Sequence, residues 1–367
     1  MMKQGWEIKK LGDVATILDS QRKPVTKKDR CNGIYPYYGA SGVQDYVDKY
    51  IFDGRYLLVG EDGAKWGASD KSAYIVDGKC WVNNHAHILK LDNSINDKMV
   101  EYYLVYKDLS EYITGAIVPK LTQQALKQIP IPVPERAEQE RIVGELDCLS
   151  GIIAAKRAQL RELDTLAQSI FYTMFGDPIT NDKGWQTKKL GDVALIVGGS
   201  TPSTREETNW NGDLNWVTPA ELNGTLYYGE TQRKITTEGA RGLELLPVGT
   251  VLLSSRAPIG KLAITTVPMY CNQGFKNVVC GESINNIYVY YYLLATIENV
   301  KALGVGATFK EVSKRAVENY HILVPPIDLQ KQFAEKIENI ERQKELITKS
   351  IKETEDLFNS RMSYYFD

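Results

Sequence analysis

Polar and basic side chains recur in short loops at comparable places in the two halves of the chain. Each loop combines glycine, asparagine, serine or threonine with an isolated basic residue. Side chains of these types donate hydrogen bonds to phosphate oxygens and meet the edges of bases, so they suggest nucleic-acid contact rather than bond cleavage. The candidate contact residues are Arg22, Lys23, Lys65, Asn84 and His85 in the first half and Thr201, Arg256, Asn272, Gln273 and Lys276 in the second.

Residue patterns that would indicate catalysis are missing. Val324-Pro325-Pro326-Ile327 is not the Asn/Asp-Pro-Pro-aromatic loop of an amino-methyltransferase. Gly260-Lys261-Leu262 lacks the first glycine and the hydroxyl of a phosphate-binding P-loop. His85 has no Gly-x-Ser-x-Gly elbow to accompany it. We therefore expect no catalytic residue, metal site or cofactor, with a metal-dependent nuclease that uses carboxylates such as Glu61-Asp62 as the less favoured alternative.

The length and amino-acid composition of the chain limit the class of protein to which it can belong. At 367 residues with 43% hydrophobic and 25% charged residues, the chain predicts two or three globular domains. It has no apolar run near the roughly 20 residues that span a bilayer and no secretory signal, so a cytoplasmic protein without a membrane partner is expected. Five scattered cysteines indicate reduced thiols and no zinc site. A net charge of −2 suggests that phosphate contacts are shared with a partner.

An internal duplication organises the chain. The segment Gly5–Ala15 returns at Gly184–Ala194, at an offset of 179 and with only two substitutions. Farther along, Gly115-Ala116, Ala125, Val133-Pro134 and Gln139 return as Gly306-Ala307, Ala316, Val324-Pro325 and Gln330, now at an offset of 191. The two copies share their ends and differ in their interiors. This pattern favours two modules with a common scaffold and different binding surfaces.

A long helix is predicted after each module. Apolar residues recur at alternating spacings of four and three, the a/d pattern of a coiled coil, with a charged interruption at Lys156. Each helix would run about 40 residues, or about 60 Å, and the connectivity favours antiparallel pairing of the two. Gly176-Asp177-Pro178 is a stop signal for the first helix. The predicted seam consists of Ile142, Leu146, Leu149, Ile153, Leu160, Leu163 and Ile170 in the first helix and Phe333, Ile337, Ile340, Ile347, Ile351 and Phe358 in the second.

The predicted fold class is α+β. Two similar mixed α/β modules at residues 1–134 and 177–326 would be separated by long helices at residues 135–176 and 327–367. Within the modules, residues 56–59 and 250–253 predict short apolar strands, and residues 99–104 and 287–294 predict buried helices.

Taken together, these motifs resemble the specificity subunits of type I restriction-modification enzymes. The opening Trp6 with Lys10-Leu11-Gly12-Asp13-Val14, and its repeat at Trp185 with Lys189-Leu190-Gly191-Asp192-Val193, is typical of the start of their target-recognition domains. Further likeness lies in Tyr37-Tyr38-Gly39-Ala40-Ser41-Gly42, Gly60-Glu61-Asp62-Gly63 and Asn83-Asn84-His85-Ala86, and in Trp216-Val217-Thr218-Pro219, Ser254-Ser255-Arg256-Ala257-Pro258-Ile259-Gly260 and Asn272-Gln273-Gly274.

The resemblance implies two target-recognition domains joined by antiparallel helices, each domain reading one half of a split double-stranded DNA target. It also implies that two modification subunits, which bind S-adenosylmethionine and methylate adenine, dock around the helices. Restriction subunits, which hydrolyse ATP, can join that complex. The remaining alternative is a coiled-coil interaction scaffold that binds proteins and no DNA.

Overall fold

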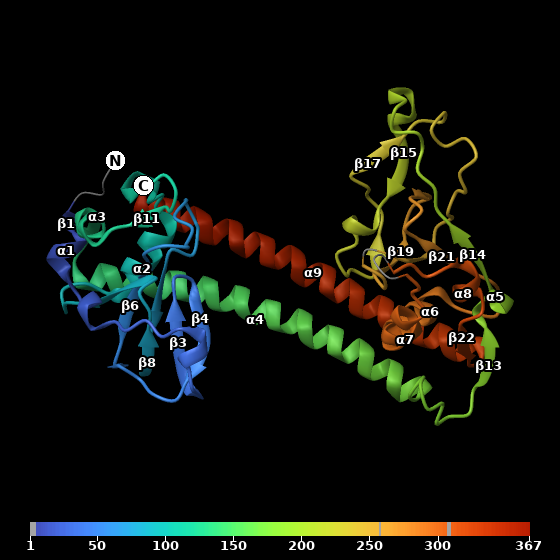
Figure 1. The fold of residues 1–367 in the computed structure, drawn as a ribbon, viewed down its shortest axis with the longest axis horizontal. Helices are drawn as coiled ribbons and strands as arrows, with labels where there is room; N and C mark the ends of the chain where they lie inside the picture. The colour runs from blue at the N-terminus through green and yellow to red at the C-terminus, as the bar shows by residue number, and fades with distance from the viewer. Residues whose placement is uncertain (1–4, 257, 307–309) are drawn as a thin grey trace. The chain divides into compact units, whose positions relative to one another are not determined.

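The computed structural model describes residues 5–256, 258–306 and 310–367, and these residues divide into two compact units. Unit 1 comprises the described residues up to Arg157 together with Thr348–Asp367, and unit 2 comprises those within Ala158–Ile347. Each unit thus combines one globular module with one end of each long helix (Figure 1). Ala257 and Ala307, which belong to the motifs above, lie outside the described residues.

The described residues of the unit 1 module form two four-stranded sheets and two short two-stranded ribbons. The sheets have the strand orders β2-β9-β6-β7 and β4-β3-β8-β5, and the ribbons are β1-β12 and β10-β11. The elements are β1 (Glu7–Lys10), α1 (Leu11–Val14), β2 (Ala15–Ile17), η1 (Asp19–Gln21), η2 (Lys27–Asp29), β3 (Asn32–Gly39), β4 (Gly42–Val47), β5 (Phe52–Asp53), β6 (Tyr56–Gly60), β7 (Ala73–Val76), β8 (Lys79–Val82), β9 (Ala86–Leu91), α2 (Asp97–Tyr106), η3 (Ser110–Tyr112), β10 (Ile113–Thr114), β11 (Lys120–Leu121), α3 (Gln123–Gln128) and β12 (Pro130–Val133).

The module of unit 2 repeats this plan with a larger central sheet. Its sheets have the orders β14-β21-β18-β19-β16 and β17-β15-β20, and its ribbon is β13-β22. The elements are β13 (Gln186–Lys189), α5 (Leu190–Val193), β14 (Ala194–Gly198), η4 (Glu207–Asn209), β15 (Trp210–Val217), η5 (Pro219–Glu221), β16 (Tyr227–Tyr228), β17 (Arg233–Ile235), β18 (Val251–Leu253), β19 (Leu262–Thr265), β20 (Tyr270–Cys271), β21 (Lys276–Cys280), α6 (Asn286–Ala295), α7 (Ile297–Ala302), α8 (Lys314–Glu318) and β22 (His321–Val324).

The duplication predicted from sequence is present in the strand pairing. β1 pairs antiparallel with β12, and β13 pairs with β22 in the same register. β3 pairs parallel with β8, as β15 does with β20. The α+β fold class is therefore confirmed, as are the short apolar strands at β6 and β18 and the buried helices α2 and α6.

Apolar residues fill both faces of each central strand. In β6, Leu57 and Val59 belong to the core cluster that includes α2, whereas Leu58 faces the other way into the cluster beneath the second sheet. In β18, Val251 and Leu253 face the core with α6, and Leu252 faces the second sheet. A strand buried on both faces is uniformly apolar, and this explains the unbroken apolar runs in the sequence.

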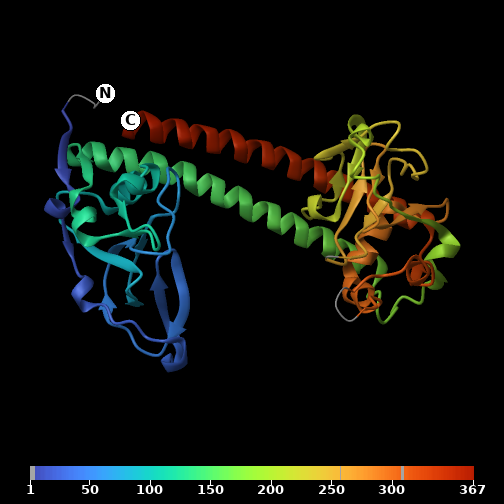
Figure 2. The ribbon, with the colours of Figure 1, turned by 45° about the horizontal axis from the view of Figure 1, so that its top comes forward.

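The long helices α4 (Arg136–Phe175) and α9 (Ile327–Phe366) pair antiparallel within each unit. In unit 1, the C-terminal part of α9 runs beside α4 (Figure 2). There the Nζ of Lys156 donates to the Oγ of Ser350 at 2.6 Å. In unit 2, the Nζ of Lys344 lies 2.7 Å from a carboxylate oxygen of Asp164. Gly176 ends α4 with a positive φ of 78°. Every predicted seam residue is buried or half-buried.

A buried glutamine joins each long helix to its module. The amide nitrogen of Gln139 donates to the carbonyl of Pro134 at 2.8 Å, and its oxygen accepts from the backbone of Asn96, the N-cap of α2, at 2.6 Å. Gln330 repeats both contacts with Pro325 and with Asn285, the N-cap of α6, each at 2.8 Å. Gln139 is 1% exposed and Gln330 is fully buried. The start of each helix is therefore fixed to its own module.

Candidate nucleic-acid interface

The predicted contact residues of unit 1 lie in three loops near one end of β6 and β9. The loops follow β2, follow β6 and join β8 to β9. The backbone N–H of Glu61 donates to the carbonyl of His85 at 2.9 Å, which joins the second and third loops at their bases. The side chain of Asn83 accepts from the backbone N–H of His85 at 2.8 Å and closes a tight turn. That turn displays the side chains of Asn84 and His85, which are exposed.

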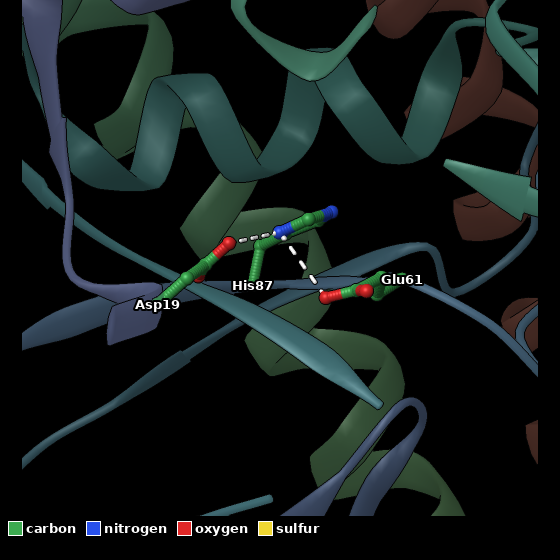
Figure 3. Close-up of side chains that lie close together, drawn as sticks. All are labelled: Asp19, Glu61 and His87. Atoms are coloured by element: carbon green, nitrogen blue, oxygen red, sulfur yellow. Dashed lines mark hydrogen bonds and ion pairs between the residues drawn. The ribbon is translucent and has the colours of Figure 1, made fainter. Parts of the chain in front are cut away.

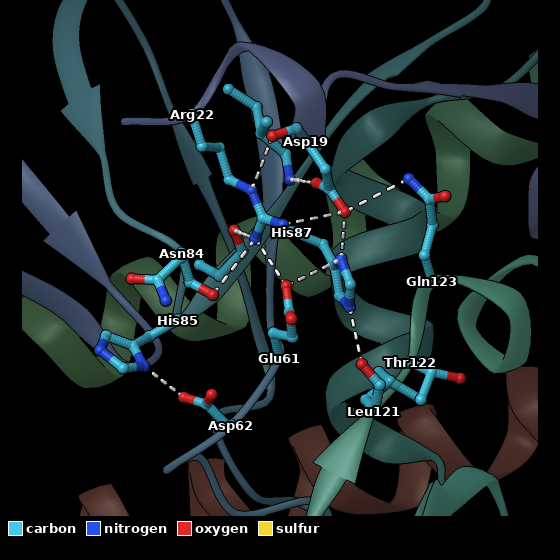
Figure 4. A network of polar contacts seen from close by, with 12 residues as sticks. Asp19, Arg22, Glu61, Asp62, Asn84, His85, His87, Leu121, Thr122 and Gln123 are labelled. Atoms are coloured by element: carbon cyan, nitrogen blue, oxygen red, sulfur yellow. Dashed lines mark hydrogen bonds and ion pairs between the residues drawn. The ribbon is translucent and has the colours of Figure 1, made fainter. Parts of the chain in front are cut away.

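A network of mostly buried ionic side chains connects these loops to one another (Figure 4). The Nη1 of Arg22 donates to the Oε2 of Glu61 at 2.6 Å and to the carbonyl of Ala86 at 2.7 Å. Its Nε donates to the carbonyl of Asp19 at 3.1 Å, and its Nη2 lies 3.4 Å from the carboxylate of the same residue. The Arg22 side chain is 11% exposed. The expectation that its guanidinium meets DNA does not fit this geometry, because all three nitrogens already have partners inside unit 1.

His87 lies at the centre of this network and was not among the predicted residues. Its Nδ1 is 2.6 Å from the Oδ2 of Asp19, and its Nε2 is 2.7 Å from the carbonyl of Leu121. Both nitrogens thus face oxygen acceptors, and a ring protonated at both would donate to each of them. Burial by itself would raise the pKa of Asp19, but the hydrogen bond and charge of His87 and the N–H of Ile88 lower it overall.

Asp19, Glu61 and His87 together offer ligand atoms within 4.8 Å of one another, which raises the question of a metal ion (Figure 3). The donor set does not fit one. The Glu61 carboxylate is paired with Arg22, and its Oε1 lies 2.5 Å from the Nζ of Lys120. Because cations already neutralise the carboxylates, a divalent ion would have to displace them. The neighbouring Asp62, named in the nuclease alternative, instead contacts the imidazole of His85.

The other predicted residues of unit 1 are placed differently from Arg22. The side chains of Lys23, Lys65 and Asn84 are exposed, and the carbonyl of Lys23 accepts from the indole N–H of Trp81 at 2.6 Å. His85 is exposed although its Nδ1 contacts Asp62. These four residues are available to a ligand, and their role as contacts stays a prediction.

Unit 2 carries the same arrangement of loops. The side chain of Asn272 accepts from the backbone N–H of Gly274 at 2.9 Å and closes the same turn as Asn83. The N–H of Ser255 donates to the carbonyl of Gly274 at 2.7 Å, as Glu61 does to His85. The turn displays Gln273, whose side-chain oxygen accepts from the hydroxyl of Thr201. The loops after β14 and before β21 are thereby connected.

The two predicted basic residues of unit 2 both approach one carboxylate. The Nζ of Lys276 lies 3.2 Å from Glu311 and 3.3 Å from the hydroxyl of Ser255, and its side chain is 13% exposed. The Nη1 of Arg256 lies 3.8 Å from Glu311 and is more exposed. Arg256 can therefore turn toward a ligand, whereas Lys276 is held inside the unit.

Lys120 and Glu311 were missed although the sequence contains a signal for them. Each stands five residues beyond the repeated glycine, Gly115 or Gly306, at the same offset of 191. Comparing the two copies position by position would have marked them as equivalent residues of opposite charge. Isolated charged residues in variable loops carry no such signal when each copy is considered separately.

Two further expectations from the sequence concern the cysteines and the polarity of the helices. All five cysteines are free thiols, and burial raises the pKa of Cys80 to about 11 and that of Cys271 to about 12. Among the described residues, helices long enough to cross a bilayer are all too polar to do so.

Comparison with known proteins decides the family. The sequence matches the family described as type I restriction modification DNA specificity domain over residues 3–164 and again over residues 182–356. The chain belongs to this family. A putative type I restriction enzyme specificity subunit of Haemophilus influenzae is 26% identical over 366 residues, which cover 98% of this chain and 94% of the relative. A type I restriction enzyme specificity subunit of Methanocaldococcus jannaschii is 34% identical over 180 residues, or 46% of this chain and 42% of the relative.

Solved structures agree with this specificity subunit in fold. The type I restriction-modification S subunit of M. genitalium matches with a TM-score of 0.64 at 13% identity, covering 99% of this chain and 96% of that one. A chain from a study of complex assembly and conformational transition of the type I system matches with a TM-score of 0.59 at 17% identity, covering 100% and 98%. The specificity subunit is thus the generally non-catalytic, DNA-recognising member of its system. The family assignment favours this role over that of a scaffold without DNA.

Proposed function

We propose that this specificity subunit reads a bipartite DNA target, one half with the loops of each unit. The observation that supports this most directly is the repeated turn closed by Asn83 in unit 1 and by Asn272 in unit 2. The backbone of the turn is the same, but it displays Asn84 and His85 in one unit and Gln273 in the other. A shared scaffold that presents different side chains is what recognition of two different half-sites requires.

The proposed contacts are residues of these loops that keep part or all of their side chain accessible. In unit 1 they are the exposed Lys23, Lys65, Asn84 and His85, and in unit 2 they are the exposed Gln273 and the half-buried Thr201, Arg256 and Asn272. Amide side chains such as Asn84 and Gln273 suit base edges, whereas Lys23 and Lys65 suit phosphates. Arg22 and Lys276, which are enclosed, would act by holding the loops.

Partner subunits would supply both the chemistry and part of the affinity. A chain with a net charge of −2 has little cationic surplus for phosphates, so tight binding would draw on basic surfaces of its partners. We propose that two modification subunits dock along α4 and α9 and methylate adenine, and that restriction subunits can join them in the cytoplasm. Exposed apolar side chains on the helices, including Ile152, Leu166, Leu346 and Leu357, offer a surface for such docking.

Methylome sequencing tests the proposal. Cells that express the modification subunits with this chain should show a bipartite methyladenine motif, and cells with the modification subunits alone should not. Replacing residues 177–326 by the corresponding module of a relative should change one half of the motif and preserve the other. A motif that is independent of this chain, or whose two halves change together, would contradict the proposal.

A further inference from the structure

Three residues in unit 1 have structural counterparts in unit 2. The N–H of Leu121 donates to the carbonyl of Glu61 at 2.8 Å, and the N–H of Val312 donates to the carbonyl of Ser255 at 2.9 Å. Glu61 therefore corresponds to Ser255, and the residues before Leu121 and Val312, namely Lys120 and Glu311, correspond to each other. The pairings Gly60↔Ala86 and Ser254↔Phe275 likewise make His87 the counterpart of Lys276. These assignments rest on backbone geometry alone.

In unit 1 the residue that contacts both of the others is Glu61, a carboxylate. The Oε1 of Glu61 lies 2.5 Å from the Nζ of Lys120, and its Oε2 lies 3.5 Å from the Nδ1 of His87. Arg22 adds a third cation at 2.6 Å, and Asp19 adds a second carboxylate beside His87. Arg22, Lys120 and the imidazole of His87 thus face two carboxylates.

In unit 2 the carboxylate stands at a different one of the three positions, that of Lys120. The lysine at the position of His87, Lys276, lies 3.2 Å from the carboxylate at the position of Lys120, Glu311. The position of Glu61 is occupied by a neutral serine, Ser255, whose hydroxyl lies 3.3 Å from Lys276. Arg256 approaches Glu311 at 3.8 Å, as Arg22 approaches Glu61. In this cluster two cations face one carboxylate.

We infer that the triplets Glu61–His87–Lys120 and Ser255–Lys276–Glu311 are two versions of one loop clamp, which positions the DNA-reading loops of its own unit and so determines the specificity of one half-site. This inference rests on the proposed function. Each clamp joins the end of the central strand, the start of β9 or β21, and the segment that begins at Lys120 or Glu311. These are the three segments that border the turn on which the proposed contact residues are displayed.

The clamp of unit 1 also fixes a hairpin that reaches into solvent. Lys120 is the first residue of β11, which pairs with β10, and the loop between the strands carries Ile117 at 95% exposure and Val118 at 62%. Besides backbone pairing, the contacts of Lys120 with Glu61 and of His87 with the carbonyl of Leu121 connect this hairpin to the loops around the turn. A change in the clamp should therefore move the hairpin relative to the turn, which displays the proposed contacts Asn84 and His85.

A charge reversal followed by a transplant tests the clamp. In the complex with its modification subunits, Lys120→Glu places a carboxylate against Glu61, and methylation of the wild-type motif should fall about tenfold or more, with degeneracy confined to one half of the motif. The triple variant Glu61→Ser, His87→Lys, Lys120→Glu reproduces the clamp of unit 2. It should recover methylation of the wild-type motif to within about threefold of wild type, since the pairing of opposite charges is restored.

Two controls accompany these variants. Lys9→Glu makes the same charge change beside Glu7 at an exposed pair and should leave the motif unchanged. Glu311→Lys faces Lys276 and Arg256 and should loosen the other half of the motif. Thermal unfolding of each purified complex reports whether the variants fold.

The outcomes separate the clamp from the proposed function. A Lys120→Glu complex that keeps full methylation activity and both halves of the motif overturns the clamp. The clamp is also overturned if the triple variant folds but does not recover methylation, or if Lys120→Glu weakens both halves of the motif equally. A wild-type complex without a bipartite motif overturns the proposed function and the clamp with it. Loss confined to one half, with recovery in the triple variant, supports the clamp, because a merely destabilising substitution would not be reversed by two further substitutions.

Discussion

At the scale of single residues, the interior of the unit 1 loops depends on charges that are separated widely in the sequence. Asp19 accepts from His87 and from the N–H of Ile88 at 3.1 Å, and only 9% of its side chain is exposed. Its contacts hold its pKa below the ordinary value of 3.8 in the folded protein. A carboxyl group with a depressed folded pKa stabilises the fold above its unfolded pKa, and this contribution is lost as the pH falls through the folded pKa.

We expect Asp19→Asn to lower the free energy of unfolding of unit 1 by about 3 kcal/mol near neutral pH, since it removes one of the two carboxylates that face the buried His87 and Arg22. The deficit relative to wild type should begin to narrow as the pH falls below about 4, where the carboxylate of the unfolded chain becomes protonated. It should disappear only below the depressed pKa of Asp19 in the folded protein. Denaturant unfolding measured from about pH 7 to about pH 3 checks this. The exposed Asp48→Asn serves as control, and a deficit that does not change with pH would contradict the assigned role.

Sequence reasoning identified loops that the fold brings together within each unit, but it could not distinguish displayed from enclosed side chains. Asn84 and Arg22 have equally plausible local contexts, yet Arg22 is enclosed by Glu61, which is 39 residues away in the chain. Lys276 is enclosed by Glu311, 35 residues away. Which charged side chain finds a partner is decided by tertiary contacts, and a local pattern of residue types does not contain that information.

At the scale of elements, the best-predicted features are those with a long periodic signal. The bounds of α4 and its end at Gly176 follow from the a/d spacing and the glycine stop, and α9 follows from the repeat. By contrast, the single-turn helices α1 and α5 and the parallel pairing of β3 with β8 are determined by long-range packing. Periodicity over so few residues is too short to predict them.

The glutamine at the start of each long helix yields a prediction of its own. Gln139→Ala removes three hydrogen bonds and leaves the N–H of Asn96 and the carbonyls of Ser94 and Pro134 without that partner. Because the site is buried, we expect a loss of about 2–5 kcal/mol in the free energy of unfolding. Gln330→Ala should act similarly in unit 2. Gln168→Ala, an exposed position of α4, is the control, and equal stability of Gln139→Ala and Gln168→Ala would contradict the anchoring role.

At the scale of the whole molecule, the duplicated chain alternates a module with a helix that belongs to both units. The first residues of α4 lie in unit 1 and its last residues in unit 2, and α9 crosses in the opposite direction. The turn and the clamp occur in both units, whereas the interiors of the two modules differ. For example, β16 adds a fifth strand to the central sheet of unit 2. Such a plan lets each module change without altering the helices.

The helices should then set the spacing between the half-sites. Removing residues 156–162 from α4 and residues 347–353 from α9 deletes one heptad from each helix and keeps the seam in phase. Seven helical residues span about 10 Å, and base pairs are stacked at about 3.4 Å, so the spacer of the methylated motif should shorten by about three base pairs while both half-sites persist. Deleting the heptad from α4 alone is the control, and it should abolish methylation because the two seams no longer match. Methylome sequencing of the paired deletion measures the spacer between the half-sites. An unchanged spacer would show that the partner subunits, and not the helices, set the distance between the half-sites.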